Sequence, residues 1–145
     1  MATLKSGVPA ATFALGGIDP DFERADVRFE GLTPPERSFE VRIFLDEPNA
    51  GARTPTDANP RYLGSQYFYG TGSSRAPRAS PAAAHRDKQL EPSDIRLNVT
   101  SSLRTFLAAS AKTNSAPVTL VAVDRDGQEI ADPGLRFERL SLVTS

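Results

Sequence analysis

The sequence feature that most constrains the fold is the alternation of apolar and polar residues in SFEVRIFL, residues 38–45. One phase of the alternation is entirely apolar: Phe39, Val41, Ile43 and Leu45. The other phase is largely polar: Ser38, Glu40, Arg42 and Phe44. A period of two is typical of a β-strand, because successive side chains point to opposite faces of a sheet. We therefore predict an antiparallel sheet with one buried face and one solvated face.

Further short apolar runs are separated by Pro, Gly, Asp and Asn, which favour turns. They lie at residues 12–15, 25–31, 61–70, 95–99, 117–123 and 135–143. The run PVTLVAV, residues 117–123, is almost continuously apolar, which predicts a central strand. The last run changes phase after Phe137, which predicts a bulge near Glu138 or Arg139.

Helical spacing occurs once, in TSSLRTFLAAS, residues 100–110, where Leu103, Phe106 and Leu107 share one face. Thr100 or Ser101 is the predicted N-cap of this helix. Together these patterns predict an all-β protein: a single antiparallel β-sandwich of six or seven strands with one short crossover helix.

The segment 71–94 interrupts this pattern, because it is rich in Ser, Ala, Pro and Arg and has no apolar period. Such a composition cannot pack a core, so we predict a long flexible insertion. A chain of 145 residues without an internal repeat suits one domain, 1–145, containing that insertion.

The composition argues against most catalytic and metal chemistry. The chain has no Cys and only one His, His85, so it cannot build a multi-histidine copper, zinc or iron centre by itself. Asp124 and Asp126 fit a hairpin turn better than a calcium loop, because the closing Glu is lacking. We therefore expect no catalytic residues, no cofactor and no bound metal.

Charge and hydropathy limit the partners and the compartment. The net charge of -1 and the pI of about 5.8 argue against a nucleic-acid-binding face, although Arg75, Arg78, Arg86 and Lys88 form a loose basic cluster. No apolar run is long enough for a signal peptide or a membrane span, so we expect a soluble, cytoplasmic protein that binds neither nucleic acid nor membrane.

Several stretches, taken in order, resemble the C-terminal domain that follows the copper core of polyphenol oxidases and tyrosinase-like proteins. They are SFEVRIFLDEPNA, TPTDANPRYLGSQYFYGTG, IRLNVTSSLRTFL, PVTLVAVDRDG and RFERLSLV, and the resemblance spans residues 25–143. Plant members carry Lys-Phe-Asp-Val where this chain has Ser38, Phe39, Glu40 and Val41, so only the inward pair is kept. Bacterial relatives are more similar in the aromatic strand, around Tyr62, Gly64 and Ser65.

This resemblance implies a non-catalytic accessory domain, because the histidines of the copper core are absent from this chain. In the relatives the domain packs over the entrance of the copper site and either blocks it or supports folding and copper loading. The implied partner is thus a protein, a type-3 copper oxidase core. The candidate partner contacts are Tyr67, Phe68 and Tyr69, because three consecutive aromatic residues on a strand cannot all face one core. Either Phe68 or the pair of tyrosines must point away from it.

Two other functions stay open from the sequence. The chain could be a structural or assembly subunit that self-associates through sheet edges. It could also be an enzyme using carboxylates and tyrosines, which would require a deep pocket that holds two carboxylates with shifted pKa values.

Overall fold

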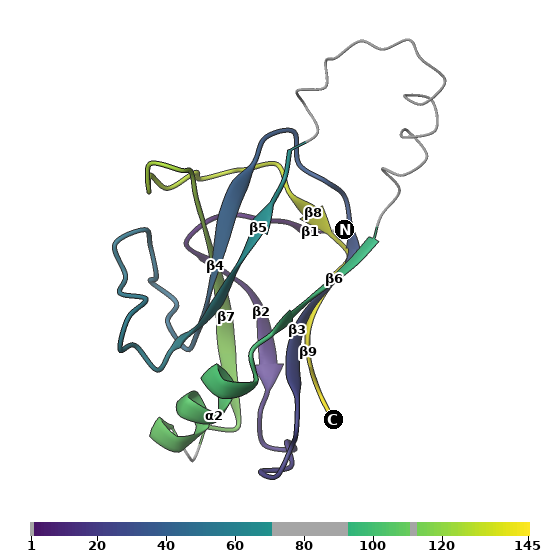
Figure 1. The fold of residues 1–145 in the computed structure, drawn as a ribbon, viewed down its shortest axis with the longest axis vertical. Coiled ribbons are helices and arrows are strands. Elements are labelled where there is room, and N and C mark those ends of the chain that lie inside the picture. Colours follow the sequence, from purple (N-terminus) through teal and green to yellow (C-terminus); the bar gives the residue numbers. More distant parts are fainter. Residues whose placement is uncertain (1, 71–92, 111–112) are drawn as a thin grey trace.

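A computed structural model of the protein describes residues 2–70, 93–110 and 113–145. These residues form a β-sandwich, with seven strands of six residues or more, two strands of two residues, and the helix α2 (Figure 1). The strands are β1 (Ala2–Thr3), β2 (Val8–Ala14), β3 (Ala25–Leu32), β4 (Phe39–Leu45), β5 (Tyr62–Phe68), β6 (Ser93–Asn98), β7 (Ser115–Val123), β8 (Arg136–Phe137) and β9 (Arg139–Thr144). The predicted all-β sandwich with one short helix is confirmed.

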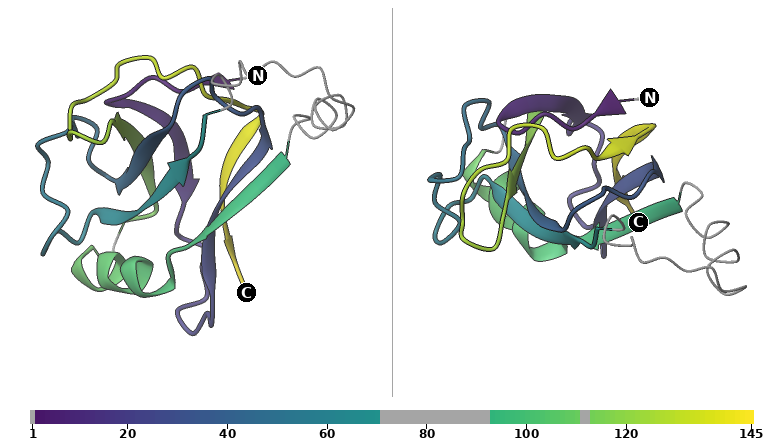
Figure 2. Two further views of the ribbon diagram at one scale, coloured as in Figure 1. Left: turned by 45° about the horizontal axis from the view of Figure 1, so that its top comes forward. Right: turned by 90° about the horizontal axis from the view of Figure 1, so that it is seen from above.

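The two sheets of the sandwich are antiparallel throughout, with strand orders β2-β7-β4-β5 and β6-β3-β9. β1 and β8 form a separate two-stranded sheet at the end of the sandwich opposite α2 (Figure 1). β7 lies between β2 and β4, so the run 117–123 is a central strand, as predicted. At one side of the sandwich β5 of the first sheet lies beside β6 of the second (Figure 2).

The core lies between the sheets and is built from the inward phases of their central strands. Val27 and Phe29 on β3 face Val41 and Ile43 on β4, and none of the four side chains is exposed. Complete burial of side chains of this size stabilises the fold by roughly 1.5–3 kcal/mol each. The alternation in SFEVRIFL therefore predicted the buried face of β4 correctly.

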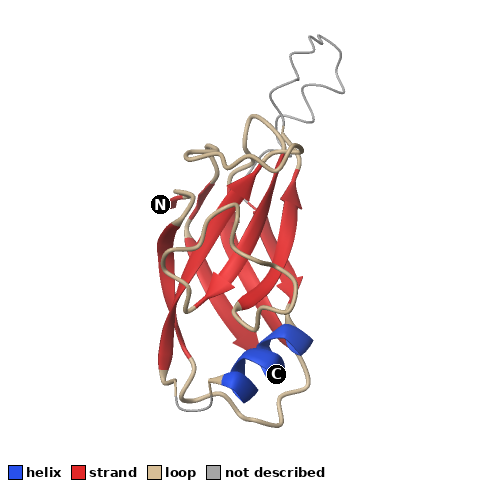
Figure 3. Ribbon diagram, turned by 90° about the vertical axis from the view of Figure 1, so that its left-hand side faces the viewer, coloured by secondary structure: helices blue, strands red, loops and turns tan. Residues whose placement is uncertain are grey.

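Helix α2 (Thr100–Ala109) covers one end of the sandwich and carries the chain from β6 to β7 (Figure 3). Leu103 and Phe106 are its fully buried residues. The predicted cap was wrong, because Val99 is the N-cap and the helix begins at Thr100. The Asn98 side chain replaces a cap: its Oδ1 accepts hydrogen bonds from the Thr100 amide at 3.0 Å and from the Thr100 hydroxyl at 2.6 Å.

The outer face of β4, which the alternation predicted to be solvated, is solvated only in part: Glu40 and Arg42 are half-buried. Phe44 is completely buried and forms a second, smaller cluster with Ala50, Val121 and Val123. The cluster exists because the connection 46–60 folds back over this face and contributes Ala50 to it. The Tyr62 ring, with its centroid 5.3 Å from that of Phe44, packs against the same cluster.

Two irregularities set the direction of the side chains near the strand ends. In β5, Gly64 pairs with Ile43 and Tyr62 with Phe44, so Leu63 is a bulge, and its side chain is buried. In the last run, β8 ends before Glu138 and β9 begins after it, so the irregularity lies where the sequence predicted a bulge but takes the form of a break between two strands.

Ser93 and Asp94, the last two residues of the predicted insertion at 71–94, belong to β6. The rest of that prediction, residues 71–92, lies outside the described residues, as do His85 and the basic cluster. No helix in the part of the chain described above is long and apolar enough to cross a membrane.

Candidate functional site

The three consecutive aromatic residues divide between the core and the surface. Phe68 is only 3% exposed, and its ring meets the Phe29 ring edge-on at 5.6 Å and lies 5.8 Å from the Phe39 ring. Tyr67 and Tyr69 point the other way and are 42% and 77% exposed. Phe68 is therefore a core residue, and the predicted contact surface reduces to the two tyrosines.

Tyr67 and Tyr69 form one aromatic patch, which we call the tyrosine pair. Their ring centroids are 4.8 Å apart, with 53° between the ring planes. Among the described residues the one other large apolar side chain that is exposed is Val8, on β2 at the opposite edge of the same sheet. The tyrosine pair thus concentrates exposed aromatic area at the β5 edge, with two phenol hydroxyls able to hydrogen-bond to a partner.

The chain after the tyrosine pair is held against the turn that leads into β4. The Gly70 amide donates a hydrogen bond to the Ser38 hydroxyl at 2.7 Å. A Cβ atom at Gly70 would collide with the backbone of Glu36 and Arg37, so only glycine permits this approach. The contact fixes the end of β5 and with it the position of Tyr69.

The charged residues beside the tyrosine pair already have partners. Glu40 lies opposite Tyr67 in the sheet and pairs with Arg42 at 3.2 Å. Arg42 also donates from Nη1 to the Ala52 carbonyl at 3.1 Å. These groups form a polar border to the aromatic patch, as is usual around the centre of a protein interface.

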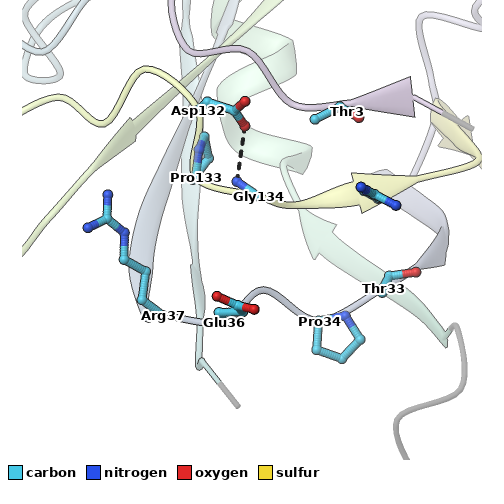
Figure 4. A pocket seen from close by; sticks show the side chains of 9 residues that line it. Thr3, Thr33, Pro34, Glu36, Arg37, Asp132, Pro133 and Gly134 are labelled. Carbon is cyan, nitrogen blue, oxygen red and sulfur yellow. Dashed lines mark hydrogen bonds between the residues drawn. The ribbon is translucent and has the colours of Figure 1, made fainter. Parts of the chain in front are cut away.

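A pocket of 730 Å³ opens at the same end of the sandwich, between the turn 33–37 and the segment 132–136. Figure 4 shows Thr33, Pro34, Glu36 and Arg37 along one wall and Asp132 and Gly134 along the other. The complete lining is Thr3, Thr33, Pro34, Glu36, Arg37, Asp132, Pro133, Gly134 and Arg136.

Asp132, in one wall of the pocket, has a lowered pKa. The Lys5 ammonium, 3.0 Å away, and the Gly134 amide, at 3.2 Å, hold the pKa of Asp132 below its ordinary value. A carboxylate with a lowered pKa stays ionised at neutral pH and is unsuited to act as a general acid.

One further acidic side chain, that of Asp124, serves the structure. The Asp124 Oδ1 accepts hydrogen bonds from the amides of Asp126 and Gln128, both at 2.9 Å, and this closes the predicted turn. Across residues 2–70, 93–110 and 113–145, no three His, Cys, Asp or Glu side chains gather as the ligands of a metal ion would.

The fold of this protein is similar to part of several solved structures, although no protein-family model and no curated protein matches its sequence. Two structures of latent aurone synthase, a polyphenol oxidase, one recombinantly expressed and one from the natural source, each align with a TM-score of 0.57 at 10% identity. A third, co-crystallised with hexatungstotellurate(VI), aligns with a TM-score of 0.51 at 12% identity.

These alignments cover 99% of this chain but 26%, 26% and 23% of the three matched chains. This protein therefore spans about a quarter of their length and matches them as one domain of a larger protein. The likeness agrees with the resemblance to the polyphenol oxidase C-terminal domain that the sequence indicated, and at this identity it shows the fold.

Proposed function

We propose that this protein is a non-catalytic accessory domain that docks on a type-3 copper oxidase core, shielding the entrance of its copper site or assisting its maturation. The single observation that carries the proposal is the tyrosine pair, an exposed aromatic patch on a sheet edge whose end is fixed by the Gly70–Ser38 contact. The likeness in fold to latent polyphenol oxidases supports the choice of partner.

The tyrosine pair combines a large exposed aromatic surface with low side-chain flexibility. Tyrosine side chains have two rotatable angles, so a partner that covers them loses little conformational entropy. A central Tyr contact of this kind typically contributes about 2 kcal/mol to binding, which is roughly a 30-fold change in Kd. The paired charges of Glu40 and Arg42 would border the contact without leaving an unpaired charge buried.

Capture of the partner tests this proposal. The tagged domain is incubated with its native cell extract, and the retained material is assayed for copper and for phenol oxidation. We expect a copper oxidase core in fixed ratio to the domain, and its loss when Tyr67 and Tyr69 are both changed to Ser. The matched control is Val8→Ser, which removes exposed apolar area at the opposite edge of the same sheet.

A second function, that of an assembly subunit, is favoured by the strand order. β5 ends its sheet, so the tyrosine pair stands beside a strand edge at which another chain could pair. If the capture experiment recovers only the domain itself, as a higher oligomer that dissociates when Tyr67 and Tyr69 are changed to Ser, the protein is an assembly subunit and not an accessory domain. Retention of the copper core by the doubly substituted domain would refute the tyrosine pair as the docking surface.

A further inference from the structure

We propose that the pocket between residues 33–37 and 132–136 binds a carboxylate, and that in the complex this is an Asp or Glu side chain of the docked protein. We call it the arginine pocket, after Arg37 and Arg136 in its lining. The identity of the protein partner rests on the proposed function, whereas the carboxylate preference rests on the pocket alone.

The frame of the arginine pocket is held by backbone hydrogen bonds and prolines. The Thr33 amide donates to the Arg136 carbonyl at 2.8 Å, which ties the two walls together at one end. Pro34 and Pro133 stand in opposite walls and limit the backbone freedom of both. The pocket is therefore part of the fold and needs no rearrangement to form.

The charges in the pocket leave its arginines available. The Asp132 carboxylate forms its close ion pair with Lys5 at 3.0 Å and accepts a hydrogen bond from the Gly134 amide, while Arg136 acts on it only at longer range. Neither Arg37 nor Arg136 forms an ion pair with an acidic residue in the described ranges, and both are exposed. Glu36 is the remaining charged group of the lining. The lining thus carries two positive and two negative side chains, and Lys5, which lies outside the lining but pairs with Asp132, leaves a surplus of one positive charge.

This arrangement selects a carboxylate in particular. A guanidinium group offers parallel N–H donors that match the two oxygens of a carboxylate, and the hydroxyls of Thr3 and Thr33 supply further donors in the lining. A phosphate would match the guanidinium equally well, but its second negative charge would meet Glu36 and Asp132. The surplus of one positive charge therefore suits a singly charged anion.

The arginine pocket adjoins the tyrosine pair. The backbone of Arg37 lies in close contact with Gly70, which directly follows Tyr69. A protein that covers Tyr69 therefore lies close to the turn that carries Arg37, and Tyr and Arg are among the residues that most often dominate protein interfaces. An acidic side chain beside an apolar contact on the partner would meet both surfaces together.

The first test uses the isolated domain and propionate, which has the chemistry of a Glu side chain. The arginine Nε–H and backbone amide signals are followed by NMR at constant ionic strength, with inorganic phosphate as the second probe. We expect saturable shifts at Arg37, Arg136 and Thr33 with propionate and smaller ones with phosphate. Arg136→Gln should abolish these shifts, whereas Arg96→Gln, which removes an exposed arginine from the other sheet, should retain them.

Shifts that do not saturate and that remain in Arg136→Gln would show that the pocket is not a binding site. Tighter binding of phosphate than of propionate would show that the pocket does not prefer a carboxylate. With the captured copper core, Arg136→Gln should weaken binding about tenfold and reduce its dependence on salt. Unchanged affinity and salt dependence would overturn the acidic contact while the tyrosine pair still accounts for docking. If the wild-type domain captures no copper core, the proposed function fails, and the propionate titration still decides the pocket.

Discussion

Replacing Phe68 by Ala should unfold this protein far more readily than replacing either neighbouring tyrosine. Phe68 is almost completely buried, and its ring lies 5.6 Å from Phe29 and 5.8 Å from Phe39. Truncation of a buried Phe removes its transfer free energy and leaves a cavity, which together cost about 3–5 kcal/mol. The edge-on contact with Phe29 adds to this loss, since such aromatic pairs are worth roughly 0.5–1.5 kcal/mol.

The two tyrosines provide the comparison. Tyr67→Ser and Tyr69→Ser change exposed side chains, so each should alter the free energy of unfolding by less than about 0.5 kcal/mol. Loss of the contact between the two tyrosine rings adds to this change in either variant. A loss of 4 kcal/mol at Phe68 lowers the Tm of a domain of this size by roughly 12–16 °C. Phe68→Leu, which keeps most of the volume, should cost less than about 2 kcal/mol.

Urea denaturation followed by circular dichroism measures these differences, with the slope m compared between variants to confirm that the unfolding reaction is the same. Equal destabilisation by Phe68→Ala and Tyr69→Ser would refute the division of the three aromatic residues between core and surface. So would a Phe68→Ala variant with wild-type stability.

Two further predictions concern hydrogen bonds that cross the structure. Glu129 accepts hydrogen bonds from the Ser6 hydroxyl at 2.9 Å and from the Ala52 amide at 3.2 Å, so Glu129→Ala should lower the free energy of unfolding by about 1 kcal/mol and speed hydrogen exchange at the Ala52 amide. Glu129→Gln keeps an acceptor and should have a smaller effect on both quantities. Unchanged exchange at Ala52 in Glu129→Ala would contradict this role. Arg28, 2.6 Å from Asp94, holds the pKa of Asp94 below its ordinary value of 3.8. The ion pair therefore stabilises the fold at neutral pH, and this stabilisation is lost as the pH falls through the lowered pKa. Asp94→Asn should therefore destabilise at pH 7 and match the wild type in strong acid, whereas parallel stability curves would argue against the ion pair.

The sequence predicted the elements whose side chains follow a simple period. Alternation in β4 identified Val41 and Ile43 as core residues, and the continuous apolar run in β7 identified a central strand. The same alternation failed for Phe44, because it assigns a face to a side chain but does not reveal whether a loop covers that face. The covering connection has no apolar period and contributes mainly Ala50 to the second cluster.

The candidate site was predictable in part. Alternation required Phe68 and the tyrosine pair to face opposite ways, but the choice between them depends on the register that places Phe68 opposite Phe39. The arginine pocket had no sequence signal, because its two walls lie about a hundred residues apart and consist of turn-forming residues. For the start of α2 a signal did exist: Asn two residues before Thr100 fits a local side-chain-to-backbone hydrogen bond.

Hydrogen exchange on the complex measures whether the tyrosine pair is the docking surface for a copper oxidase core. The amides of Tyr67, Tyr69 and Gly70 are measured in the free domain and in the presence of the captured core, with Val8 on the opposite edge as internal reference. We expect slower exchange at the end of β5 and no change at Val8. Protection elsewhere in the domain, with unchanged exchange from Tyr67 to Gly70, would contradict it.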